Sequence, residues 1–162
     1  MSSILIGRAK PEHIFKAVVH TMTESYQISH LFKASPKRVY ETWLSSAEKS
    51  LATGVKSTIE PVANVPFTEV DGYVTGTNLR LEPYHKIVQS WRTAKFPADS
   101  KISLVKIVFS ASHNGTVAAI EHENVPAGYS VLCKQDWSDY YFEPLSEYLS
   151  VGDRKFIRPE LS

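Results

Sequence analysis

The chain has 162 residues, a length that suits one domain with a sizeable core. Its hydrophobic fraction of 43% and charged fraction of 22% are ordinary for a globular protein, which argues against a disordered or fibrous chain. The 18 lysines and arginines against 17 acidic side chains give a net charge of +1. The charge balance therefore gives no electrostatic reason to expect nucleic acid or an anionic membrane as a partner.

The single cysteine, Cys133, excludes an internal disulfide and any multi-cysteine zinc site. This usage is typical of a reducing cytoplasm. No apolar run approaches the roughly 18–20 residues that a membrane-spanning helix needs. The short apolar run at residues 4–6 precedes its positive charges, unlike the order in a signal peptide. The sequence thus predicts a cytoplasmic protein without a membrane span or an export signal.

Residues 1–23 differ in pattern from the rest of the chain. Pro11 suits the first position of a helix, and the apolar residues that follow recur at helical spacing: Ile14, Phe15, Val18, Val19 and Met22. Two interpretations stay open, a short helix that packs on the domain or on a partner, and a tail with weak helical character. We therefore divide the chain into an N-terminal extension (1–23), a folded domain (24–150) and a C-terminal tail (151–162).

The folded domain begins with a predicted strand followed by a predicted helix. From Ser25 the period-two pattern places four residues on one face: Tyr26, Ile28, His30 and Phe32. Ser35 then suits an N-cap and Pro36 the first helical position. The apolar stripe of this helix consists of Val39, Tyr40, Trp43 and Leu44.

A second short helix and a series of strands are predicted next. Ser45 or Ser46 suits the N-cap of that helix, and Gly54 suits its end. The expected strands cover residues 56–61, 66–70, 73–81, 86–93, 102–109 and 116–123. Asp71-Gly72 and Asn114-Gly115 are two-residue hairpin signals, so the last three strands form an antiparallel meander.

The chain ends in a long predicted helix from Ser130 to about Ser150. Pro144 removes a hydrogen bond from this helix, and a kink is expected near Tyr140. Within the preceding sheet, Gly76 indicates a bulge or a close approach of another chain segment. An antiparallel sheet with helices on one face is an α+β fold.

Several motifs together resemble a known family. In chain order they are Val70-Asp71-Gly72-Tyr73-Val74-Thr75-Gly76, Pro83, Ile87-Val88-Gln89-Ser90-Trp91-Arg92, Asn114-Gly115, Val125-Pro126-Ala127 and Gln135-Asp136-Trp137-Ser138-Asp139-Tyr140-Tyr141-Phe142. Their order and spacing are similar to the C-terminal domain of activators of the heat-shock protein 90 ATPase, over about 25–149. The resemblance implies the START-like (SRPBCC) helix-grip superfamily. Its fold is β-α-α-β(6)-α, a curved antiparallel sheet wrapped around a long C-terminal helix, with a groove under that helix.

The resemblance implies two kinds of partner. Two-domain activators stimulate the chaperone, while single-domain relatives are suspected binders of small hydrophobic molecules. No counterpart of the N-terminal half that docks the chaperone's middle segment is found in the sequence. We therefore expect a non-catalytic, co-chaperone-like interaction module that contacts heat-shock protein 90 without robust activation. The alternative is a START-like protein that binds a small hydrophobic ligand.

Strand parity identifies the side chains that face the expected groove. It selects four polar residues and one tryptophan among apolar neighbours, and the long helix adds two aromatic ones. The candidate ligand-binding residues are Gln89, Trp91, Ser103, His122, His30, Trp137 and Tyr141. A structural interpretation competes for each, because a buried polar group can bond backbone, water or a tyrosine hydroxyl, and aromatic residues at helical spacing usually form core.

The sequence gives less support to catalysis. The histidines lack the three- or four-residue spacing of helical metal ligands, and no nucleophile elbow, dinucleotide or phosphate motif occurs. No cofactor, metal or catalytic residue is therefore predicted, and an enzyme using His122 or His30 as a base is the weakest alternative. Cys133 suits a small core residue better than a nucleophile. A basic surface for an acidic partner, as opposed to a solvated mixed face, would comprise Lys33, Lys37, Arg38, Arg92 and Lys95.

Overall fold

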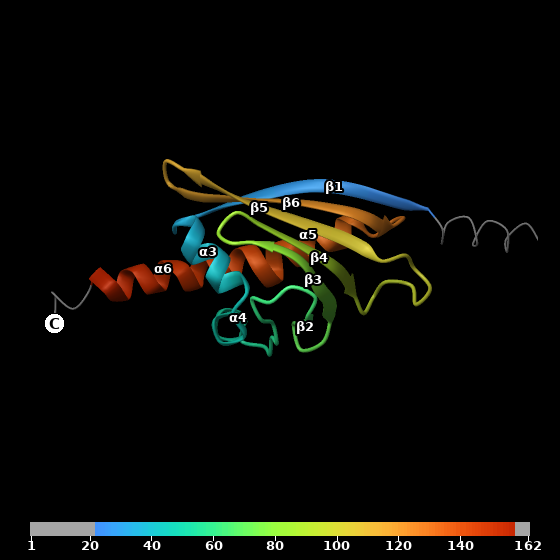
Figure 1. Cartoon of the computed structure of the whole chain (residues 1–162), viewed down its shortest axis with the longest axis horizontal. Coiled ribbons are helices and arrows are strands. Elements are labelled where there is room, and N and C mark those ends of the chain that lie inside the picture. The colour runs from blue at the N-terminus through green and yellow to red at the C-terminus, as the bar shows by residue number, and fades with distance from the viewer. Residues whose placement is uncertain (1–21, 158–162) are drawn as a thin grey trace, which may run out of the picture.

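A computed structural model describes residues 22–157. Its elements follow the order β1 (Thr23–Phe32), α3 (Pro36–Trp43), α4 (Ser46–Thr53), β2 (Pro66–Glu69), β3 (Val74–Glu82), β4 (Lys86–Thr93), β5 (Ser103–Ser112), β6 (Gly115–Pro126), α5 (Ser130–Trp137), η1 (Ser138–Phe142) and α6 (Glu143–Ile157). The helix predicted near the N-terminus lies outside the described residues. Figure 1 shows the long C-terminal helix against one face of the sheet, with α3 and α4 at one end.

Both short helices begin, and α4 ends, where the capping residues predict. The Ser35 hydroxyl accepts a hydrogen bond from the backbone N–H of Arg38, and the Ser45 hydroxyl accepts one from that of Glu48. Gly54 ends α4 with φ of 76°, a left-handed conformation that glycine adopts without steric cost. Residues at the helix ends therefore fix the start of α3 and both the start and the end of α4.

The strands form one antiparallel sheet in the order β1-β6-β5-β4-β3-β2, which confirms the helix-grip class and the predicted meander. The expected strand at 56–61 is absent, and Thr58 makes only an isolated bridge to Thr68. A sixth strand after the helices is therefore missing. Pro61 is the last residue of the expected segment, and proline cannot donate a ladder hydrogen bond.

Both hairpin predictions need correction in detail. Glu69 pairs with Val74, so the first connection has four residues, with positive φ at Val70, Asp71 and Gly72. This longer loop leaves Glu69 paired within the sheet and buried. In the second hairpin Ser112 pairs with Gly115, so the turn lies one residue earlier than predicted.

The long helix contains a π-helical turn, η1, between α5 and α6. Pro144 has no N–H to donate to the carbonyl of Tyr140, so the regular α-helical ladder cannot continue there. The wider turn accommodates this loss without ending the helix. α6 continues to Ile157, so the helix extends beyond the expected end near Ser150 into the predicted tail.

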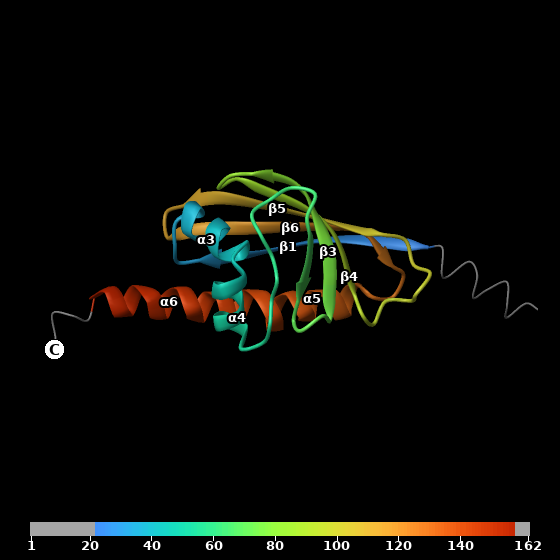
Figure 2. The same ribbon diagram turned by 60° about the horizontal axis from the view of Figure 1, so that its bottom comes forward.

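The core lies between the concave face of the sheet and the long helix, as Figure 2 shows. Every second residue of β4, β5 and β6 is buried there, which confirms the predicted facing: Ile87, Gln89, Trp91, Ser103, Val105, Ile107, Phe109, Ala118, Ile120 and His122. On β1, Tyr26 and Phe32 are buried, whereas Ile28 and His30 are half-buried. Sequence parity therefore identified the inner face of the sheet.

Candidate functional site

A chain of hydrogen bonds crosses the interior from the long helix to β5. Trp137 Nε1 donates to the Tyr26 hydroxyl at 2.7 Å, and that hydroxyl lies 2.6 Å from His122 Nδ1. His122 Nε2 lies 2.9 Å from Ser103 Oγ, which donates to the Trp91 carbonyl. The four side chains that form this series of hydrogen bonds are all buried: Trp137, Tyr26, His122 and Ser103.

The donor and acceptor roles in this series of hydrogen bonds indicate which nitrogen of His122 carries the proton. The Ser103 hydroxyl hydrogen bonds the Trp91 carbonyl, so Ser103 accepts from His122 Nε2–H. Because the neutral ring carries its one proton on Nε2, Nδ1 accepts from the Tyr26 hydroxyl, whose oxygen in turn accepts from Trp137 Nε1–H. Burial lowers the pKa of His122 to about 3, which agrees with a neutral ring. Both ring nitrogens are occupied, so His122 has no free lone pair with which to act as a base here.

Aromatic rings fill the space beside this chain. Trp137 stacks on Trp91 at a centroid separation of 5.1 Å and lies 4.5 Å from Tyr141. Trp43 stacks on Tyr141 at 5.7 Å. Five predicted ligand-binding residues therefore meet in one place, where they contact one another: Trp91, Ser103, His122, Trp137 and Tyr141.

The other two predicted residues lie apart from this cluster. Gln89 is buried and donates to the side chain of Asn78 on β3 at 2.9 Å. His30 lies at the sheet margin, where Nε2 is 2.6 Å from Ser146 Oγ and the ring stacks on Phe142 at 4.9 Å. The ligand-binding role of all seven residues stays a prediction.

A buried ion pair lies under α4 and was not predicted from the sequence. Lys49 Nζ pairs with Glu69, and the Tyr141 hydroxyl donates to the same carboxylate at 2.9 Å. The ammonium also lies over the rings of Trp43 and Tyr141, 5.0 and 4.7 Å from their centroids. Burial lowers the pKa of Lys49, which the Glu69 carboxylate opposes. One signal was available, since Glu69 follows Phe67 at strand spacing and therefore shares its inward face.

A groove of about 850 Å³ opens on the exterior between the short helices and the β3–β4 hairpin. Its apolar lining comprises Tyr40, Leu44, Ile59, Pro61, Leu81 and Tyr84. Tyr84 stands at its margin, 45% exposed, with its ring against that of Tyr40 at 5.7 Å. Glu41 and Glu48 add negative charge to the rim, and Arg38 pairs with Glu48 at 2.6 Å.

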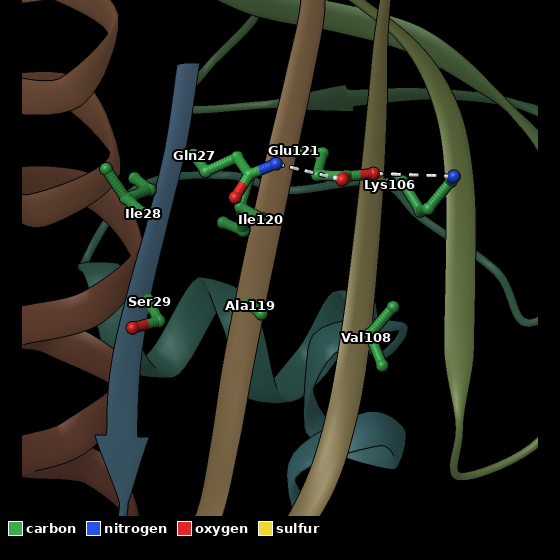
Figure 3. Close-up of a pocket in the computed structure, with 8 residues that line it drawn as sticks. All are labelled: Gln27, Ile28, Ser29, Lys106, Val108, Ala119, Ile120 and Glu121. Carbon is green, nitrogen blue, oxygen red and sulfur yellow. Dashed lines mark hydrogen bonds and ion pairs between the residues drawn. The ribbon is translucent and has the colours of Figure 1, made fainter.

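A smaller hollow of about 470 Å³ lies on the outer face of the sheet, over β1, β6 and β5. Figure 3 shows the short side chains of Ser29 and Ala119 at its centre. Above them, Glu121 accepts from Gln27 at 3.1 Å and pairs with Lys106 at 3.4 Å. The hollow is therefore polar on one side and shallow.

The predicted basic residues do not gather on one surface. Lys37 and Arg38 lie on α3, where they contact Tyr84 and Glu48. Arg92 and Lys95 lie at the end of β4, the opposite end of that strand from Tyr84, and Arg92 donates to the carbonyl of Pro97 at 3.0 Å. The structure therefore favours a solvated mixed face.

Among the described residues, no group of three or more histidine, cysteine or acidic side chains is arranged to hold a metal ion. Cys133 is buried, and burial raises the pKa of its thiol to about 12, which keeps it protonated. Within residues 22–157, no helix combines the length and apolar character needed to cross a bilayer.

Comparison with known proteins gives consistent matches across the domain. The family model described as "Activator of Hsp90 ATPase homolog 1-like protein" matches residues 33–150. The human protein named activator of 90 kDa heat shock protein ATPase homolog 1 is 26% identical over 129 residues, which cover 80% of this chain and 38% of that protein. An uncharacterized protein of Schizosaccharomyces pombe is 26% identical over 153 residues, 93% of this chain and 44% of that one.

A solved structure confirms the fold. An HSP90 activator from Plasmodium falciparum superposes with a TM-score of 0.70 at 19% identity, covering 78% of this chain and 96% of that one. The chain thus spans well under two thirds of the curated relatives that it matches, but nearly the whole of this solved domain.

Proposed function

We propose a function from the premise that this chain belongs to the activator of Hsp90 ATPase homolog 1-like family, whose model matches well over half of its length. The chain is a co-chaperone-like module that binds heat-shock protein 90 through its exterior and catalyses no reaction itself. The human relative is matched over only 38% of its length, so the proposal concerns binding and not strong activation. A cytoplasmic location, which the single unpaired cysteine favours, belongs to the same proposal.

The observation that carries the proposal is the family match, which runs from the end of β1 through the long helix. The packing of the interior supports an exterior site. His122 has both ring nitrogens occupied, and the rings of Trp91, Trp137 and Tyr141 are in mutual contact. A partner would then bind to side chains that are exposed on the exterior of the protein.

The groove between α3, α4 and the β3–β4 hairpin is the docking surface that we propose for the chaperone. It combines an apolar floor with a half-exposed tyrosine, Tyr84, and aromatic residues at the margin of a groove are frequent anchors of protein interfaces. Glu41 on its rim favours a chaperone segment that carries positive charge beside apolar side chains, whereas Glu48 is already paired with Arg38.

The test is a titration of isotope-labelled protein with heat-shock protein 90 from the same cells, followed by amide NMR and by the chaperone's ATPase rate. We expect shifts that cluster on the groove, with a small change in rate. Tyr84→Ala should weaken binding about tenfold or more, as for a typical anchor residue.

Val131→Ala is the matched control, because Val131 is 80% exposed on α5, away from the groove. It should bind like the unchanged protein. Absence of shifts at tens of micromolar chaperone would contradict the proposal. Shifts on another face would keep the partner but move the docking surface.

A further inference from the structure

The two edges of the sheet are built differently. β2 has four residues, begins with a proline, and is covered by Thr58, whose N–H donates to the Thr68 carbonyl at 2.8 Å while Thr68 N–H donates back at 3.0 Å. Short length, proline and a covering segment are ways in which proteins block an exposed edge. β1 forms the other edge, and it has ten residues.

The alternation of ladder bonds shows which groups of β1 face outward. Phe109 N–H donates to the His85 carbonyl, so odd-numbered residues of β5 bond on the β4 side and even-numbered ones bond to β6. The same alternation continues across the β5–β6 and β6–β1 pairs. The backbone groups of the even-numbered residues of β1 therefore form hydrogen bonds with β6. The backbone N–H and C=O groups of Gln27, Ser29 and Leu31 therefore point away from the sheet, and no partner for them occurs between residues 22 and 157.

β1 also lacks the residues that usually guard an edge. It contains no lysine, arginine or proline, and its one acidic side chain, Glu24, accepts from the N–H groups of Gly128 and Ser130 at 3.0 Å each. That carboxylate fixes the start of α5 and does not project across the edge. A long edge without such guards is a template for strand addition.

Acidic side chains from α6 lie beside this edge. Glu143 and Glu147 are exposed, one helical turn apart, and share a shallow hollow of about 590 Å³ with His30, Ser146 and Ser150. The His30–Ser146 contact of 2.6 Å joins the helix to β1. Figure 3 shows the helix along the side of β1 that faces away from β6. Among the side chains that the structure describes, none forms an ion pair with Glu143 or Glu147.

We infer that the edge of β1 that faces away from β6 binds an extended, basic peptide segment of a partner as a seventh strand. The outward backbone groups of Gln27, Ser29 and Leu31 supply its hydrogen bonds. Side chains of an added strand alternate between the two faces. Those on the helix side meet Glu143 and Glu147, which selects lysine or arginine at every second position. Those on the outer face lie beside the hollow around Ser29, which accepts small uncharged side chains.

Charge distinguishes this occupant from a second copy of the chain. β1 itself carries no lysine or arginine, and two copies paired edge to edge would bring two acidic helix faces together. Like charges in such an arrangement oppose association, most strongly at low salt.

The probe is the synthetic peptide acetyl-Lys-Thr-Lys-Val-Lys-Thr-Lys-amide, titrated into the full chain at low salt. Saturation should slow hydrogen exchange of the Gln27, Ser29 and Leu31 amides about tenfold or more, as expected when edge amides enter a ladder. The same peptide with glutamate in place of each lysine should bind about tenfold or more weakly, because its charges oppose those of α6.

Two variants separate the backbone contribution from the charge contribution. Ser29→Pro removes one outward N–H without removing a bond to β6, so it should weaken peptide binding about tenfold or more. Ser29→Ala keeps this N–H and should bind the peptide normally. Glu147→Lys should weaken binding about threefold to tenfold at low salt, with Glu60→Lys, at an exposed residue outside both this hollow and the proposed docking groove, as the control of equal charge. Leu31→Pro repeats the backbone test if Ser29→Pro fails to fold.

Three outcomes would overturn the inference. Equal binding of the basic and acidic peptides would show that α6 selects no charge. Protection of the three β1 amides before peptide is added, in a monomer, would show that another part of this chain already occupies the edge. The same protection together with the mass of a dimer would assign the edge to a second copy.

Discussion

Lys49 shows how far a single residue can depart from what its type predicts. It is 1% exposed and forms an ion pair with Glu69, to which Tyr141 also donates. Lysine on an eight-residue helix is normally a surface residue. Neither the helix propensity of Lys49 nor its spacing along the sequence therefore predicts this buried cluster. Its partners come from β2 and the long helix, and only the tertiary fold brings them together.

Removing one member of the pair should cost more than removing both. We expect Lys49→Met to lower the free energy of unfolding by about 3–5 kcal/mol, because it leaves the Glu69 carboxylate buried without its cation. The double variant Lys49→Met/Glu69→Gln should recover much of this loss. Urea unfolding monitored by circular dichroism measures both, with Lys56→Met at an exposed site expected within about 0.5 kcal/mol of the unchanged protein. A double variant as unstable as the single one would contradict the pairing.

His122 makes stability depend on pH in a defined direction. Its pKa falls from 6.5 to about 3 on burial, so below pH 6.5 the unfolded chain binds a proton that the folded chain does not. Stability should therefore decrease as the pH falls from about 6.5 towards 3, by up to about 1.4 kcal/mol per pH unit from this residue alone.

The slope of unfolding free energy against pH tests this assignment. His122→Gln should reduce the slope between pH 6 and 4 by about 1 kcal/mol per pH unit relative to the unchanged protein. An unchanged slope in this variant would mean that His122 is protonated in the folded protein.

At the scale of elements, β3 is shaped by one glycine. A Cβ at Gly76 would overlap the Ser90 carbonyl oxygen on β4 and approach the Phe67 ring to 2.7 Å. This is the close approach that the sequence predicted as one of two alternatives; the irregular pairing of β3 with β4 lies between Asn78 and Arg80 instead. The ring of Phe67 can therefore pack directly on the backbone of β3.

Gly76→Ala should destabilise the sheet by about 3 kcal/mol, since backbone and a buried ring must both move. Gly72→Ala is the comparison, because its Cβ meets nothing within 4 Å and only its φ of +88° opposes the change, at about 1 kcal/mol. Thermal unfolding of the two variants measures the difference. Equal losses would indicate that β4 adjusts readily to a side chain at position 76.

Elements with local causes were predicted well from the sequence. Ser35, Ser45 and Gly54 fix α3 and α4 through bonds to neighbouring residues, and strand parity identified the buried face. Features with distant causes were predicted poorly. The loop at 70–73 follows the sheet pairing of Glu69 with Val74, and the edge segment near Thr58 makes only one bridge. Of the four predicted polar exceptions only Ser103 and His122 lie together, and their mutual hydrogen bond depends on side-chain positions that parity does not give.

On the scale of the whole molecule, the space between sheet and helix is occupied by the protein's own rings. Trp43, Trp91 and Trp137 are each at most 1% exposed and lie within 6.4 Å of a neighbouring ring centroid. A hydrophobic ligand at this place would have to displace them. The interior thus contributes stability, and the exterior offers the accessible surfaces.

Indole distinguishes a filled interior from an open one. We expect no increase in melting temperature when indole is added to the unchanged protein, because Trp137 occupies the space. Trp137→Ala should lose about 3–5 kcal/mol and should be partly restored by indole, which fits the vacated site and can donate to Tyr26. Stabilisation of the unchanged protein by indole would support the ligand-binding interpretation of the seven predicted residues.

The unequal edges of the sheet also limit how these molecules can associate. Growth of a cross-β filament requires each chain to offer one edge and accept another, so that addition can repeat without end. Here Thr58 and Pro66 close the β2 side, and the β1 side alone stays available among the described strands. Any pairing through the sheet therefore ends after one addition, and the architecture that leaves a long strand open also terminates polymerisation at its first step.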